Sequence, residues 1–220
     1  MTRTRVKICG ITTVDDGLAA ARAGADAIGL VFWAGTPRRI DVARARAIAE
    51  SLPPLVARVG LFVDPTADEV RSVLAEVPLD LLQFHGREPP ALCRSFGRPW
   101  LKAFSVSAEG DLLESLARYG DAAGWLFDAP PHDGRPGGTG HTFDWSRLPA
   151  TLARPLVLSG GLNAGNVGAA IRRLQPWAVD VSSGVEALDD NGRPRPGIKD
   201  AARIAAFIGE VRHADVRPAV

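Results

Sequence analysis

Short apolar runs alternate with longer amphipathic segments along almost the whole chain of 220 residues. The short runs are rich in Val, Ile and Leu, as expected of parallel strands that are covered on both faces. Eight runs of this kind predict strands at Arg5–Cys9, Ala27–Phe32, Ala57–Val63, Leu81–Phe84, Trp100–Phe104, Trp125–Phe127, Leu156–Ser159 and Ala178–Val181.

The amphipathic segments between these runs carry start and stop signals of helices. Thr13 is an N-cap candidate with two aspartates in the next turn, and Gly24 follows the end of that helix. Thr66 and Glu69 have the spacing of a capping box. The predicted helices cover residues 13–23, 41–51, 66 onward, 90–96, 163–174 and 198–211, with Asp41 and Asn163 as further caps and a short helix at best over 111–119.

Eight strand–helix units predict a (β/α)8 TIM barrel, and no linker divides the chain, so residues 1–220 are expected to form one domain. An open doubly wound sheet stays possible at this point, because periodicity does not show whether a sheet closes. The Gly/Pro-rich stretch 130–142 after the sixth strand is either a functional lid or a surface loop.

Composition narrows the class of protein. The formal net charge is +1, which gives no electrostatic case for a nucleic-acid or membrane partner. No apolar run is long enough to span a bilayer, and the N-terminus lacks the pattern of a secretory signal, so a cytoplasmic protein is expected. Two cysteines do not make a disulfide framework, and the histidines lack metal-binding spacing, so no metal is expected.

Barrel enzymes place their chemistry at the C-terminal ends of the strands, and these ends carry reactive side chains here. The first strand ends at Cys9 and the sixth is followed by Asp128. A thiolate can take a proton from carbon and a carboxylic acid can donate one, so the two are a candidate acid–base pair. The alternatives are a small core residue for Cys9 and a loop carboxylate for Asp128.

Glycine-rich turns follow the last two strands, where barrel enzymes often bind phosphate. Their residues are Ser159-Gly160-Gly161 and Ser182-Ser183-Gly184. Arg38 and Arg39 follow the second strand and could bind a carboxylate, although surface arginines are more often simply solvated. The two turns together favour a phosphate ligand over ordinary glycine turns, whereas spacing alone does not decide the roles of Cys9 and Asp128.

The motifs resemble those of the phosphoribosylanthranilate isomerase family of tryptophan biosynthesis. The matching stretches run from Lys7 to Glu186 in the expected order, and they are KICGIT, GADAIGLVF, TPRRI, VGLFV, QFHG, FDA, GGTGHTFDW, LSGGLN and VDVSSGVE. The resemblance implies a TIM barrel with a reduced fifth helix and an Amadori rearrangement of N-(5-phosphoribosyl)anthranilate that needs no cofactor. The expected partner is this phosphosugar, and the expected state is a monomer or a homodimer.

The resemblance also implies roles for individual positions. Cys9 would be the general base and Asp128 the general acid, and Arg38 would face the anthranilate carboxylate. The phosphate would be bound by Gly160, Gly161, Ser182, Ser183 and Gly184. Three further residues match positions of the substrate site: Asp180 near the sugar, and Lys7 and His85 in the wall with no assigned role.

Other phosphosugar barrel enzymes are the nearest alternatives. The histidine-pathway isomerase is expected to carry an aspartate where Cys9 stands, and indoleglycerol-phosphate synthase needs a set of lysine and glutamate residues that this sequence lacks. A dual-substrate histidine and tryptophan isomerase is also conceivable. A non-catalytic phosphate-binding module would keep the glycine turns but would have no use for Cys9 together with Asp128.

Overall fold

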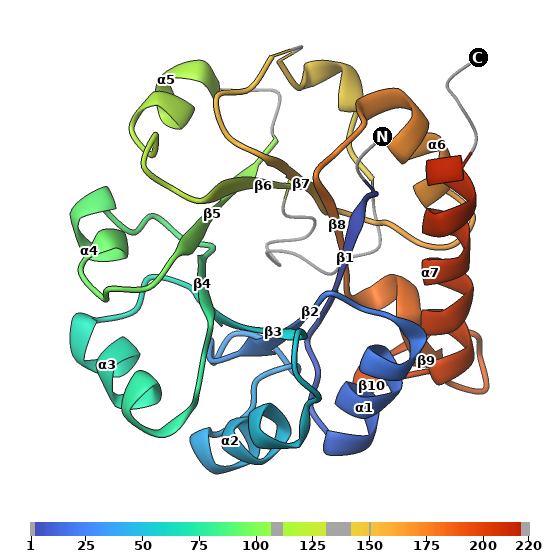
Figure 1. Cartoon of the computed structure of the whole chain (residues 1–220), viewed down its shortest axis with the longest axis horizontal. Coiled ribbons are helices and arrows are strands. Elements are labelled where there is room, and N and C mark those ends of the chain that lie inside the picture. Colours follow the sequence, from blue (N-terminus) through green and yellow to red (C-terminus); the bar gives the residue numbers. More distant parts are fainter. Residues whose placement is uncertain (1–2, 107–111, 131–141, 150, 217–220) are drawn as a thin grey trace.

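Eight parallel strands form a closed ring, and helices surround it (Figure 1). The computed structural model describes residues 3–106, 112–130, 142–149 and 151–216. Neighbouring strands pair in chain order and the last pairs with the first, so the predicted barrel is confirmed and the open sheet is excluded. The strands are β1 Arg5–Cys9, β2 Ala27–Val31, β3 Ala57–Phe62, β4 Leu81–Phe84, β5 Trp100–Ser105, β6 Gly124–Asp128, β7 Leu156–Leu158 and β8 Ala178–Val181.

The helices that cover the ring differ in length. The fifth is reduced, as expected, with six residues, and the fourth is shorter still with five. Within the described residues, the unit between β6 and β7 has a 3-10 turn, Trp145–Arg147, in place of an α-helix. The α-helices are α1 Val14–Ala23, α2 Val42–Ser51, α3 Ala67–Glu76, α4 Pro90–Arg94, α5 Leu112–Ala117, α6 Val167–Leu174 and α7 Ala201–Val216. None of these described helices is long and apolar enough to cross a membrane.

Strand alternation decides which side chains enter the barrel. Val6 and Ile8 of β1 belong to the main hydrophobic core, which lies between the strands and the helices. Lys7 and Cys9 lie on the opposite face of the same strand and are also buried. One face of β1 is therefore apolar and packs against the helices, while the other face carries polar groups into the barrel interior.

Two predicted helix starts were wrong. The helix predicted from Asn163 begins at Val167, because the Asn163 side chain accepts a hydrogen bond from the Gly165 amide (2.9 Å) and closes a turn first. The closing helix begins at Ala201 rather than Ile198, and the Asp200 carboxylate accepts from the amides of the residues two and three positions later.

A small antiparallel hairpin between β8 and α7 was missed by the sequence analysis. Its strands are β9 Glu186–Leu188 and β10 Pro194–Lys199, and they follow a 3-10 turn, Ser183–Val185. The hairpin is rich in proline, glycine and charged residues, so it lacks the alternation of apolar and polar residues that would predict a strand. The predicted lid or loop at 130–142 falls on residues 131–141, which lie outside the described residues.

The capping box at the start of α3 offers a test of the local rules that set the helix positions. The Thr66 hydroxyl accepts from the Glu69 amide (3.2 Å), and the Glu69 carboxylate accepts from the Thr66 amide (2.7 Å). Thr66→Ala should lower the free energy of unfolding by about 1 kcal/mol. Thr66→Ser keeps the hydroxyl group and should retain most of the stability that the cap contributes. Urea denaturation of the three proteins measures this, and equal midpoints for all three would contradict it.

Candidate active site

A hollow at the C-terminal ends of the strands collects six of the eleven predicted site residues. They are Cys9, Arg38, His85, Asp128, Asp180 and Ser182. The rest of its lining is mixed, with apolar side chains from β2 and β3 and the amide of Gln83. Residues from seven of the eight strand units thus meet in one place, as the barrel rule predicts.

Cys9 and Asp180 line this hollow, and Lys7 is buried next to them. Lys7 and Asp180 are partners in the register that joins β1 to β8, and their side chains form a buried ion pair of 2.9 Å from Nζ to Oδ1. Both side chains are about one-twentieth exposed (5 %). Burial lowers the pKa of Lys7, but the Asp180 charge and Cys9 outweigh this effect, so its pKa lies above the ordinary value and the amine is charged.

Burial and two neighbouring charges shift the pKa of the Cys9 thiol in opposite directions. Burial raises its pKa, the Lys7 ammonium lowers it, and the Asp180 carboxylate raises it again, so the net pKa lies above the ordinary value of a thiol. The thiolate is therefore a minor species of the unliganded protein at neutral pH. Gly29 on the neighbouring strand makes room for this group, because a Cβ at Gly29 would lie 2.7 Å from Cys9 Sγ and 3.1 Å from Lys7 Nζ.

Asp128 lies at the end of β6 within a chain of three polar side chains. Its Oδ1 accepts from the Ala129 amide (2.8 Å), and its Oδ2 lies 3.3 Å from His85 Nε2. The Gln83 Nε2 lies 3.1 Å from His85 Nδ1. With the Gln83 amide donating to Nδ1, His85 carries its proton on Nε2, the nitrogen that faces Asp128; this tautomer is assigned from the Gln83 contact.

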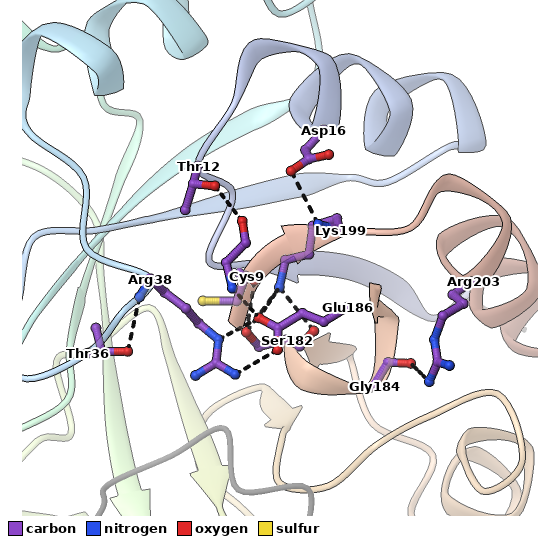
Figure 2. Close-up of polar contacts among 11 residues, drawn as sticks. Cys9, Thr12, Asp16, Thr36, Arg38, Ser182, Gly184, Glu186, Lys199 and Arg203 are labelled. Carbon is purple, nitrogen blue, oxygen red and sulfur yellow. Dashed lines mark hydrogen bonds and ion pairs between the residues drawn. The ribbon is translucent and has the colours of Figure 1, made fainter. Parts of the chain in front are cut away.

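Arg38 reaches the hollow, and Arg39 is exposed and does not line it. The Arg38 guanidinium does not present its whole fork to the hollow, however. Its Nε and Nη2 donate to the two carboxylate oxygens of Glu186 at 2.7 and 2.9 Å (Figure 2). One edge of the guanidinium is therefore bound within the protein, which the sequence analysis did not foresee.

The two predicted phosphate turns pack against each other. Gly160 and Gly161 have φ angles of 85° and 62°, which favour glycine, and a Cβ at Gly184 would lie 2.0 Å from the Leu162 carbonyl oxygen. Gly161, Ser183 and Gly184 line a second hollow of about 390 Å³ outside the first, whereas Gly160 lines neither hollow and lies against Asp128 and Ala129.

The Ser182 hydroxyl is already used within the protein. It donates to the Cys9 carbonyl (3.0 Å) and lies 3.3 Å from Lys199 Nζ, which leaves backbone amides as the expected phosphate donors of this turn.

Three polar residues of the site were missed by the sequence analysis: Gln83, Glu186 and Lys199. Gln83 and Glu186 belong to the quoted motifs QFHG and VDVSSGVE, so their identity was in view while their role was not. Lys199 lies in the unpredicted hairpin, and no pattern in the sequence marks it. Within the part of the chain that the structure describes, no three His, Cys, Asp or Glu residues are grouped as a metal site.

Comparisons with known proteins agree on one family. Residues 6–210 match the family model described as N-(5′-phosphoribosyl)anthranilate (PRA) isomerase. A protein of that name from Alcanivorax borkumensis is 55% identical over 212 residues, which cover 96% of this chain and 97% of the relative.

Solved structures give the same result. The phosphoribosylanthranilate isomerase of Thermotoga maritima has a TM-score of 0.82 and 41% identity, covering 96% of this chain and 99% of the other. A phosphoribosylanthranilate isomerase in complex with reduced 1-(o-carboxyphenylamino)-1-deoxyribulose 5-phosphate has a TM-score of 0.79 and 40% identity, covering 96% and 99% of the two chains.

The influence of Lys7 on the Cys9 thiol can be measured directly. Lys7→Met removes the ammonium group that lowers the pKa of Cys9. The Asp180 carboxylate, which raises this pKa, then acts without opposition from Lys7. The pH profile for alkylation of Cys9 by iodoacetamide should therefore move to higher pH. Peptide mass spectrometry separates Cys9 from Cys93, whose pKa is raised to about 12 mainly by burial.

Lys102→Met is the matched control, because Lys102 is equally buried but pairs with Glu88 near β4 and β5. Its Cys9 profile should stay at the wild-type position. A Lys7→Met profile that is unchanged, or that moves to lower pH, would contradict this account of the site.

Proposed function

The chain belongs to the N-(5′-phosphoribosyl)anthranilate isomerase family, and on that basis we propose how its residues carry out the reaction. The reaction converts N-(5-phosphoribosyl)anthranilate to 1-(2-carboxyphenylamino)-1-deoxyribulose 5-phosphate in tryptophan biosynthesis. The observation that carries the assignment of roles is that Cys9, at the end of β1, and Asp128, at the end of β6, line the same hollow.

Asp128 acts first, as the general acid. It gives a proton to the furanose ring oxygen, the bond from C1′ to this oxygen breaks, and the nitrogen lone pair forms the C1′=N bond of a Schiff base. This step needs Asp128 in its protonated form at the start. The His85 imidazole, whose Nε2 lies 3.3 Å from Oδ2, helps to hold the carboxyl group in place.

Cys9 acts second, as the general base. Its thiolate takes the proton from C2′, the electrons of that bond form C1′=C2′, and the iminium nitrogen becomes neutral. The enolamine then gains a proton at C1′ and loses one from the C2′ hydroxyl, which leaves the ketone. Cys9 ends as a thiol and Asp128 as a carboxylate, so one proton must return before the next cycle.

Lys7 and Asp180 support this chemistry from their position next to Cys9. The fixed Lys7 ammonium stabilises the thiolate when it forms, and Asp180 keeps that ammonium in place and faces the sugar. Burial makes the thiolate scarce but also keeps it poorly solvated, which increases its strength as a base toward a carbon acid.

The two anionic ends of the substrate bind on different units of the barrel. The phosphate lies at the turns with Gly160, Gly161 and Ser182 to Gly184, and the anthranilate carboxylate faces Arg38. With one end held by backbone amides and the other by Arg38, the ribose is oriented between them, with its C2′ toward Cys9 and its ring oxygen toward Asp128. A single-domain chain, a monomeric or homodimeric state and a cytoplasmic location stay predictions.

Removal of either acid–base group should act on turnover rather than on binding. Cys9→Ser and Asp128→Asn should each lower kcat by at least about 100-fold while KM changes little, because each variant keeps the size of the side chain and loses its proton transfer. Loss of substrate fluorescence with freshly made phosphoribosylanthranilate measures both constants. Near-normal kcat in either variant would show that its role has been assigned wrongly.

A charge at the glycine turn should instead act on binding. Gly161→Asp places a carboxylate against the expected phosphate position, and Gly161→Asn imposes a similar backbone strain at φ 62° without the charge. KM should rise much more in the Asp variant than in the Asn variant, with similar kcat. Inorganic phosphate should raise the melting temperature of the wild type and of Gly161→Asn, but not of Gly161→Asp. An equal rise for all three proteins would show that phosphate does not bind at this turn.

A further inference from the structure

We propose that Glu186, supported by Lys199, is a positioning residue that fixes Arg38 for the substrate carboxylate. The proposal rests on the role of Arg38 given above and extends it to two residues that contact the protein rather than the substrate. Both residues belong to the hairpin that follows β8, so the hairpin would serve as part of the specificity machinery of the site.

Glu186 is fully buried, and its carboxylate is surrounded by donors (Figure 2). Its Oε1 accepts from Arg38 Nε (2.7 Å), from the Gly197 amide (2.9 Å) and from Lys199 Nζ (3.2 Å), and its Oε2 accepts from Arg38 Nη2 (2.9 Å). A two-bond contact of this kind sets the plane of the guanidinium as well as its position.

Lys199 connects this contact to the end of β8 and, through it, to the catalytic strand. Its Nζ is buried and also donates to the Ser182 carbonyl (3.0 Å), and the Ser182 hydroxyl donates in turn to the Cys9 carbonyl (3.0 Å). Glu186, Lys199 and Ser182 thus form a continuous chain of hydrogen bonds between Arg38 and the backbone of Cys9.

The stem of Arg38 is held as well as its head. A Cβ on Gly10 would lie 2.7 Å from Arg38 Cδ, so the stem passes directly over the residue after Cys9. Glu186 binds the edge of the guanidinium that is formed by Nε and Nη2.

Two basic side chains share one carboxylate in this cluster, because Arg38 and Lys199 both bind Glu186. Burial lowers the pKa of Lys199, the Glu186 carboxylate raises it and the Arg38 charge lowers it again, so the net pKa lies below the ordinary value. The anthranilate carboxylate would add a second anion beside Arg38.

The test separates orientation from charge. Glu186→Gln keeps the shape but removes the negative charge, which alone would strengthen attraction for a carboxylate. Glu186→Asp keeps the charge but shortens the side chain and withdraws it from Arg38. If Glu186 acts by positioning, both variants should weaken recognition of the carboxylate; if it acts only by charge, Gln should tighten binding and Asp should leave it unchanged.

The probe is a pair of ligands compared by titration calorimetry. One is reduced 1-(2-carboxyphenylamino)-1-deoxyribulose 5-phosphate, and the other is the same molecule with a plain phenyl ring. The wild type should bind the carboxylated ligand at least about tenfold more tightly. Both Glu186 variants should lose most of this preference, with similar affinity for the phenyl ligand, and Arg38→Ala should lose it entirely.

Asp80→Asn is the matched control. Asp80 also binds an arginine through two bonds, to Arg58 Nε and Nη2 at 2.7 Å each, but the pair lies where β3 and β4 begin, at the other end of the barrel. This variant should lower the melting temperature and keep the ligand preference.

The results for the Arg38 variant and for the Glu186 variants separate the roles of the two residues. If Arg38→Ala keeps the preference for the carboxylated ligand, Arg38 does not recognise the carboxylate, and the proposal for Glu186 fails as well. Loss of preference in Arg38→Ala with an intact preference in the Glu186 variants would overturn this proposal alone. Should the Glu186 variants not fold, a crystal structure of the wild type with the carboxylated ligand decides: Arg38 should keep both bonds to Glu186, and a guanidinium turned away from Glu186 would overturn the inference.

Discussion

The pairing of the first strand with the last fixes the whole site. Closure in this register sets Lys7 directly opposite Asp180 inside the barrel, and the two charges form an ion pair that is about one-twentieth exposed (5 %). Either charge alone in that position would be very costly, so the pair is stable only when β1 and β8 meet in this register. A shift by one residue would turn Lys7 toward the helices and Cys9 away from the hollow.

Buried cation–carboxylate contacts recur around the barrel mouth, and each fixes a different part of it. Lys7 with Asp180 joins β1 to β8 next to Cys9, and Arg38 and Lys199 with Glu186 join the loop after β2 to the hairpin after β8. Such contacts are poor sources of net stability, because desolvation offsets most of their attraction. Their value here is geometric: they hold charged groups at the positions where an anionic substrate and a short-lived thiolate need them.

The sequence predicted the strands, the barrel and most helix starts, because those follow from local patterns such as the apolar run Arg5–Cys9 and the capping box at Thr66. It also identified six of the residues that meet in the hollow, since strand ends share one edge of a barrel. It missed what depends on contacts distant in sequence. The Arg38–Glu186 pair joins residues 148 positions apart, and the Lys7–Asp180 pair joins residues 173 apart. The start at Val167 was missed because a side-chain turn at Asn163 competed with the helix.

The central claim is that Asp128 opens the ring and Cys9 then removes the C2′ proton. The most direct test is the primary isotope effect on kcat with substrate deuterated at C2′, measured in the two acid–base variants. Weakening the base makes cleavage of the C2′ bond limiting, so Cys9→Ser should show a large effect. Weakening the acid makes ring opening limiting, so Asp128→Asn should show an effect close to one. A large effect in Asp128→Asn together with none in Cys9→Ser would contradict the account.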